Sequence, residues 1–159
     1  MVPFKVLSHV SVTVTDLEKA KAFYGSVLGL PEIPRPDFGF PGVWYSLGGD
    51  LQLHIIVNER LTRPPVERER FEIRYPHFAL WTEDADESAR RMAESGAHFH
   101  DFTSGPTGFR QLFIKDPDGN MIEFIGPTKA PRAHRKLGHC TLVETSIARR
   151  DERLRKLLK

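Results

Sequence analysis

Hydrophobic and polar residues alternate in two short segments that lie 68 positions apart. Residues 9–16 read His-Val-Ser-Val-Thr-Val-Thr-Asp, and residues 77–84 read His-Phe-Ala-Leu-Trp-Thr-Glu-Asp. A period of two is typical of a strand with one face on a hydrophobic core. Each segment begins with a histidine and ends at an aspartate, so the pattern predicts an internal duplication.

A helix is predicted directly after each of these strands. Apolar residues recur at helical spacing over residues 16–28, and a shorter, more polar stretch covers residues 86–95. Asp16 and Asp84 stand where a side chain accepts hydrogen bonds from the first free amides of a helix. Gly29 and Gly96 follow as stop signals.

The duplication continues into two strand-turn-strand segments, residues 43–56 and 112–125, which align at an offset of 69. Gly48-Gly49-Asp50 turns the first, and residues 116–120, Asp-Pro-Asp-Gly-Asn, turn the second. Neither glycine-containing loop precedes a helix, which favours a hairpin turn over a phosphate-binding loop. The chain is therefore predicted to run strand, helix and further strands, twice.

Four segments are expected along the chain. Residues 1–58 and 75–127 form the two modules, and residues 59–74, with Pro64-Pro65 and many charges, form an exposed linker. Residues 128–159 form a C-terminal extension, for which an imperfect apolar stripe over residues 141–158 suggests a partly helical structure.

Composition narrows the class of protein. Residues 1–127 carry 13 Lys and Arg against 18 Asp and Glu, whereas residues 128–159 carry 10 against 3, so the net charge of +2 combines an acidic body with a basic tail. We therefore expect no nucleic-acid partner. One cysteine excludes an internal disulfide and a multi-cysteine zinc site. No apolar run is long enough for a membrane span and no signal sequence is visible, so a cytoplasmic location is expected.

The alternation also predicts which polar side chains share a face. In both modules, one face of the first and last strands carries apolar residues, which are expected to pack against the helix. The opposite face carries four side chains that could bind a metal: His9, His54, His77 and Glu123. Single strand histidines are usually hydrogen-bonded core residues, but three histidines and one glutamate at equivalent positions of a repeat favour a divalent metal site. Zn, Ni, Co, Fe and Mn all suit these ligands.

The remaining histidines, including His98 and His100, have no counterpart in the duplication and are interpreted as surface residues.

Residues 5–127 resemble the vicinal oxygen chelate superfamily, which includes glyoxalases, bleomycin-resistance proteins and extradiol dioxygenases. The resemblance rests on the opening at residues 7–30, the second opening at 77–80 and the closing motif at 116–123, Asp-Pro-Asp-Gly-Asn-Met-Ile-Glu. It implies an α+β fold of two βαβββ modules that form a cupped mixed sheet around one divalent metal ion, often within a homodimer. The family's metal ligands correspond to His9, His54, His77 and Glu123.

The resemblance leaves several chemistries open. A glyoxalase-I-like lyase or isomerase, acting by bidentate chelation of a small oxygenated substrate, is the preferred reading. Glu123 or His54 would then be the catalytic base, although the family usually has Glu or Gln at the position of His54. Extradiol ring cleavage by His9, His77 and Glu123 is the alternative, but Phe113 stands where the dioxygenase signature has tyrosine. A fosfomycin-type thiol transferase and a metal-free drug-binding protein are further alternatives.

Six residues are predicted to contact the substrate. Five are placed on the metal-bearing face by alternation, and one is an arginine that could bind an anion; together they are Ser11, Thr13, Gln52, Trp81, Met121 and Arg110.

Overall fold

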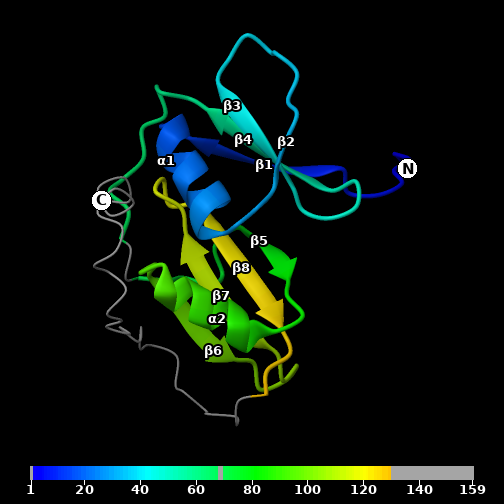
Figure 1. The fold of residues 1–159 in the computed structure, drawn as a ribbon, viewed down its shortest axis with the longest axis vertical. Helices are drawn as coiled ribbons and strands as arrows, with labels where there is room; N and C mark the ends of the chain where they lie inside the picture. The colour runs from blue at the N-terminus through cyan, green and yellow to red at the C-terminus, as the bar shows by residue number, and fades with distance from the viewer. Residues whose placement is uncertain (1, 68–69, 130–159) are drawn as a thin grey trace. The chain divides into compact units, whose positions relative to one another are not determined.

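The computed structural model describes residues 2–67 and 70–129, and the chain divides into two compact units between Thr62 and Arg63. Each unit holds a four-stranded mixed sheet and one helical segment (Figure 1). The predicted α+β fold with two βαβββ modules is confirmed.

The first unit contains β1 (His9–Val14), α1 (Leu17–Lys21), a π-helical turn η1 (Ala22–Val27), β2 (Glu32–Ile33), β3 (Gly42–Ser46) and β4 (Gln52–Val57). Its strand order is β1-β4-β3-β2, with β1 parallel to β4 and the other pairs antiparallel. The second unit contains β5 (His77–Trp81), α2 (Ala85–Glu94), β6 (Phe99–Thr103), β7 (Arg110–Lys115) and β8 (Met121–Gly126). Its order, β5-β8-β7-β6, repeats that of the first unit.

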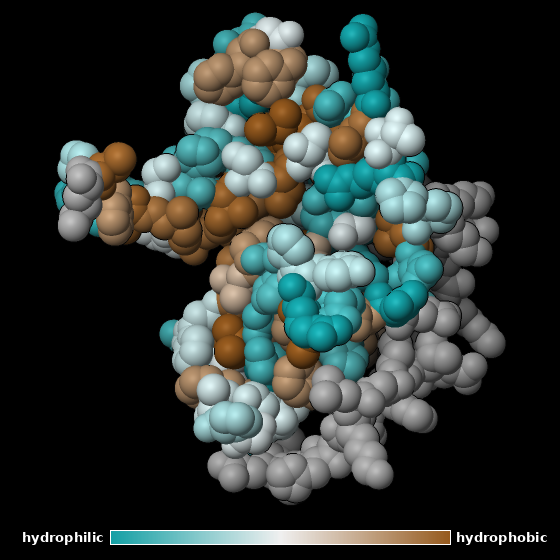
Figure 2. Space-filling model, turned by 180° about the vertical axis from the view of Figure 1, so that it is seen from behind, coloured by the Kyte–Doolittle hydropathy of each residue, from teal (hydrophilic) through white to brown (hydrophobic). Residues whose placement is uncertain are grey.

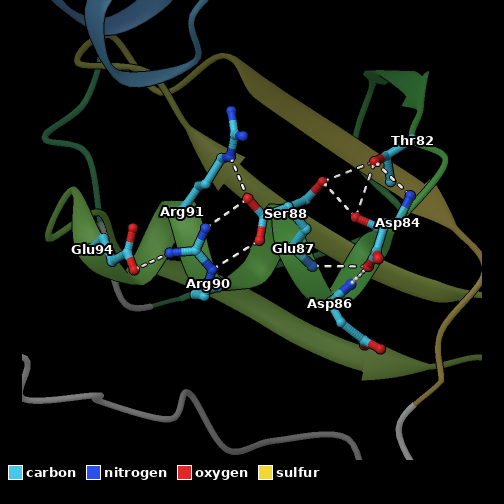
Figure 3. A network of polar contacts seen from close by, with 8 residues as sticks. All are labelled: Thr82, Asp84, Asp86, Glu87, Ser88, Arg90, Arg91 and Glu94. Atoms are coloured by element: carbon cyan, nitrogen blue, oxygen red, sulfur yellow. Dashed lines mark hydrogen bonds and ion pairs between the residues drawn. The ribbon is translucent and has the colours of Figure 1, made fainter.

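Both helices begin where the sequence predicts. The Asp16 carboxylate accepts a hydrogen bond from the Lys19 amide, and the Asp84 carboxylate accepts from the amides of Asp86 and Glu87 (Figure 3). These bonds satisfy amides that have no partner within the helix. Positive φ angles of 70° at Gly29 and 74° at Gly96 follow the two helical segments, a conformation that glycine adopts without strain.

The helical segment of the first unit differs from the prediction in its second half. Residues 22–27 form π-helical turns, in which the Leu28 amide donates to the Phe23 carbonyl, five residues earlier. The apolar spacing of residues 16–28 suits either helix type, so the sequence did not distinguish them.

A separate core lies between the sheet and the helical segment of each unit. α1 contacts β3, and α2 contacts β7 and β8. Leu53 and Ile55 are fully buried in the first unit, as are Leu112 and Ile122 in the second. Because side chains alternate along a strand, their neighbours in sequence lie on the opposite face of each sheet. We call this opposite face the open face of the sheet.

The predicted linker makes contacts with the second unit. Arg63 donates a hydrogen bond to the Asp118 carbonyl, and the Lys115 ammonium donates to the carbonyls of Glu67 and Arg70. The prediction of a C-terminal extension over residues 128–159 falls almost entirely outside the described residues. In the described part of the chain, no helix has the length and apolar character to cross a membrane.

Candidate metal and substrate site

Each sheet brings one pair of the predicted ligands together at equivalent positions. In the first unit, Ser11 is paired with His54 across β1 and β4, and His9 lies two residues before Ser11. In the second unit, Ala79 is paired with Glu123, and His77 lies two residues before Ala79. Both pairs therefore lie diagonally across two parallel strands, on the open face of the sheet.

The distance within the pair of the second unit suits either a hydrogen bond or two ligands that share an ion. Nε2 of His77 lies 3.2 Å from Oε2 of Glu123. Two ligand atoms bound to one ion at about 2.1 Å are about 3.0–3.4 Å apart in octahedral or tetrahedral geometry. Glu123 is 5% exposed, and its second oxygen accepts a hydrogen bond from the Gln111 amide group.

A backbone carbonyl orients the His77 ring. Nδ1 lies 2.7 Å from the carbonyl oxygen of Tyr75, which can only accept, so Nδ1 carries a proton. In the neutral ring, the lone pair of Nε2 then faces the Glu123 carboxylate. A backbone acceptor on the far nitrogen is the usual support for a metal-ligating histidine. The chemistry of this donor pair therefore fits a divalent metal.

The pair in the first unit is arranged differently. The rings of His9 and His54 are stacked, with centroids 4.2 Å apart and an angle of 12° between planes. The lone pair of an imidazole nitrogen lies in the ring plane, so two nearly parallel rings do not direct lone pairs at one point. As placed, this pair does not fit a shared ion, and one ring would have to rotate to join a ligand set.

His54 is held tightly in this stack. The Trp44 ring covers its other face at 4.0 Å, and Nε2 donates a hydrogen bond to the Gln52 side chain at 2.9 Å. Burial lowers the pKa of His54, and positive charge on His9 and Arg35 lowers it further. Its Nδ1 is therefore the nitrogen with the available lone pair.

Among the residues that the structure describes, no three His, Cys, Asp or Glu side chains are grouped so as to hold a metal ion. Each unit by itself contributes two of the four predicted ligands.

The predicted substrate contacts fall into two groups. Strand alternation places five of them on the open faces, where Gln52 bonds to His54 and Met121 pairs with His77 across β5 and β8. Trp81 is 62% exposed, and its ring meets that of Phe109 edge to face. Ser11 and Thr13 follow His9 along β1.

Arg110 is placed differently from the expectation that it binds an anion. It lies on the α2 face of its sheet, opposite Glu123, where its guanidinium donates to both oxygens of Asp101 at 2.9 and 2.6 Å and to Asp86 at 2.7 Å. Two carboxylates already occupy its donors, so Arg110 joins β7, β6 and α2. We do not include it in the candidate site.

Asp86 connects this arginine to the segment that follows β8. Hydrogen bonds from the Thr128 hydroxyl, above all, and from the Lys129 amide and Arg110 lower the pKa of Asp86 to about 2, while burial opposes the shift. The ordinary value is 3.8. The charged form of Asp86 is therefore favoured in the folded state.

The difference between the folded pKa of Asp86 and its ordinary value makes the unfolding free energy depend on pH in the acidic range. Because the folded pKa is the lower one, the contribution of Asp86 is complete above pH about 4 and is lost as the pH falls towards 2. We expect the unfolding free energy, measured by urea denaturation between pH 2 and 5, to fall less steeply in Asp86→Asn than in the parent chain. Equal slopes in the two proteins would contradict this assignment.

Three residues near the candidate ligands were not anticipated as site residues. Gln111 bonds to Glu123, and Phe113, paired with Glu123 across β7 and β8, meets the His77 ring edge to face at 5.3 Å. His100, interpreted from sequence as a surface residue, is half-buried on the open face of the second sheet and paired with Phe113. The alternation of Phe99, His100 and Asp101 was the signal that could have placed it.

Comparison with known proteins agrees with this architecture. The chain is 28% identical over 138 residues to a lactoylglutathione lyase of Salmonella typhimurium. The alignment covers 84% of this chain and 98% of the relative. A putative glyoxalase family protein from Bacillus anthracis superposes with a TM-score of 0.65 at 27% identity, covering 80% of this chain and 98% of the other. TnmS3, an antibiotic binding protein from Streptomyces sp. CB03234, superposes with a TM-score of 0.60 at 27% identity, covering 80% and 99%. Residues 6–124 match the profile of one family, and the chain belongs to it: the Glyoxalase/Bleomycin resistance protein/Dioxygenase superfamily.

Proposed function

We propose that this protein is a divalent-metal-dependent lyase or isomerase of the glyoxalase type, which acts on a small substrate with two vicinal oxygens. The observation that carries the proposal is the His77–Glu123 pair, 3.2 Å apart and oriented by Tyr75 and Gln111. Family membership and the likeness to a lactoylglutathione lyase support the class of reaction.

His77 and Glu123 would hold the metal, and His9 is the best candidate for a further ligand. His9 is exposed, and rotating its ring would break only the stack on His54 and the contact of Nδ1 with the neighbouring Ser8 hydroxyl. The ion would supply positive charge for two substrate oxygens and for the negative charge that develops on them.

His54 is better suited to move a proton than to bind the ion. Stacking on Trp44 restrains its ring, and Gln52 accepts from Nε2, which leaves Nδ1 as the basic atom. Its lowered pKa favours the neutral form that a general base needs. In a glyoxalase-type reaction, such a base would take a proton from one substrate carbon and return it to the adjacent carbon.

Metal content is the first test. We expect untagged protein, purified anaerobically, to contain close to one zinc, nickel or cobalt ion per chain, and His77→Ala to lose it. His98→Ala, which removes a histidine just before β6, is the matched control and should retain the metal. Iron or manganese lost from His77→Ala would favour the dioxygenase alternative. No metal after reconstitution would contradict the proposal.

A metal-free ligand-binding protein is the second candidate, and the ring stack of the first unit favours it. His9, His54, Trp44 and Phe38 form a continuous series of rings on one open face, and TnmS3 shows that relatives include an antibiotic binding protein. Such a surface suits a flat aromatic ligand. Tight binding of planar compounds by metal-free protein, without turnover of any hemithioacetal, would favour this candidate.

We further propose that the protein forms a homodimer through its N-terminal segment. This segment leads into the edge strand β1, and Figure 2 shows hydrophobic side chains over it. Four of its apolar side chains are largely exposed, Phe4 to 91%: Val2, Phe4, Val6 and Leu7. Covering such side chains contributes about 1.5–3 kcal/mol each. We expect light scattering to give a dimer for the full chain and a monomer for Phe4→Asp/Val6→Asp. Lys5→Asp is the control, and a monomeric parent chain would contradict the proposal.

A further inference from the structure

His100 is surrounded by phenyl rings on the open face of the second sheet. Its ring lies 5.9 Å from that of Phe71 with 22° between planes, 5.7 Å from that of Phe102 and 6.4 Å from that of Phe113. We call these four residues the aromatic cluster. Rings at these distances interact favourably in stacked and edge-to-face arrangements.

Lys115 fixes the position of Phe71, which belongs to the segment before β5. The ammonium lies 4.9 Å from the centre of the Phe71 ring and donates hydrogen bonds to the carbonyls of Glu67 and Arg70. Phe71 is thereby held against the open face of the second sheet, beside His100. The cluster thus combines one ring from this segment with three rings from strands β6 and β7.

Strand register places the cluster beside the proposed ligand pair. His100 pairs with Phe113, and Phe113 pairs with Glu123, so the three residues form one row across β6, β7 and β8. Two strand spacings separate the Cα atoms of His100 and Glu123 by roughly 10 Å. His100 is therefore too far away to join the metal ligands. Phe113 lies between them and is itself buried, so a substrate held at Glu123 would have to pass over this ring to reach His100.

The imidazole edge of His100 is accessible. In the described part of the chain, His100 forms no hydrogen bond, and no buried side-chain nitrogen or oxygen lacks a partner. Both ring nitrogens must therefore be reached by solvent, even though phenyl rings surround the imidazole. A polar, unpartnered edge within an apolar wall is typical of ligand-contacting surfaces.

We propose that His100, with Phe71 and Phe102, contacts the end of the substrate that is distal to the chelated oxygens and favours an aromatic group there. This inference rests on the proposed function, because it takes the position of the substrate from the His77–Glu123 pair. It assigns the substrate class as aryl-substituted compounds with two vicinal oxygens. Burial lowers the pKa of His100, which keeps the ring neutral and suited to contact with an apolar group.

Two hydroxamates test the inference without requiring turnover. Benzohydroxamate and acetohydroxamate offer the same two oxygens to a metal ion and differ in a phenyl or methyl group. Their dissociation constants would be measured by calorimetry on the Zn²⁺-loaded full chain. We expect the parent protein to prefer benzohydroxamate by about tenfold, since several aromatic contacts distinguish the probes.

The variants distinguish the loss of the aromatic contact at His100 from misfolding of the protein and from loss of the metal. His100→Ala and Phe71→Ala should reduce the preference to below about threefold while acetohydroxamate affinity stays unchanged, and His100→Phe should restore the preference. His98→Ala is the matched control and should behave like the parent. Unchanged preference in His100→Ala, or equal binding of both probes by the parent, overturns this inference alone. Failure of both probes to bind overturns the proposed function and this inference with it.

Discussion

Replacing Glu123 by alanine is expected to remove the divalent metal and to lower the turnover of a hemithioacetal substrate by at least about 100-fold. Losing residues that merely support a ligand costs about 10–100-fold in metal affinity or activity, so losing the ligand itself should cost at least as much. Glu123 is the only carboxylate among the four candidate ligands, and it is buried between His77 and Gln111. The measurements are elemental analysis and steady-state kinetics with the methylglyoxal–glutathione adduct.

Two further variants separate metal binding from folding. Glu123→Gln retains the size of the side chain and an oxygen for Gln111, so it should fold like the parent while binding metal weakly. Glu94→Ala removes an exposed carboxylate that pairs with Arg90 on α2, and it should retain both metal and turnover. Full turnover by Glu123→Ala, with metal still bound, would show that the reaction does not depend on this site.

The positions of His77 and Glu123 could be predicted from sequence because strand geometry determines them. Side chains alternate with a period of two, and both strands turn their apolar residues to the helix, so His77 and Glu123 had to lie on the opposite face of the sheet. The stacking of His9 on His54 could not be predicted in this way. It depends on side-chain torsions and on Trp44 from a third strand, and neither follows from alternation within one strand.

The surroundings of His100 could not be predicted from the sequence, for a different reason. The candidate ligands occupy equivalent positions of the repeat, whereas His100 has no counterpart in the first module. Its contact with Phe113 depends on the pairing of β6 with β7, and Phe71 approaches it from a segment interpreted as an exposed linker. Residues that recognise one substrate need not be duplicated when a module is duplicated. The repeat pattern therefore indicates metal ligands more readily than residues that determine specificity.

Arg110→Ala is expected to destabilise the second unit without changing the KM of a chelated substrate. Arg110 is mostly buried and bonds to Asp101 and Asp86, so its removal leaves two carboxylates without their common partner. Breaking a buried ion pair costs about 3–5 kcal/mol, and partial exposure of this one reduces the expected loss of unfolding free energy to about 2–3 kcal/mol. Urea denaturation at neutral pH measures the loss.

Arg90→Ala is the matched control for this prediction. Arg90 also bonds to two carboxylates, Glu87 and Glu94, but all three groups lie on the exposed surface of α2 (Figure 3). Solvent screens such pairs, so the control should change stability little. If Arg110→Ala instead raised KM and left the unfolding free energy unchanged, the arginine would act on the substrate, as its sequence position first suggested. The direction of its guanidinium, toward α2 and away from Glu123, is the reason to expect the opposite.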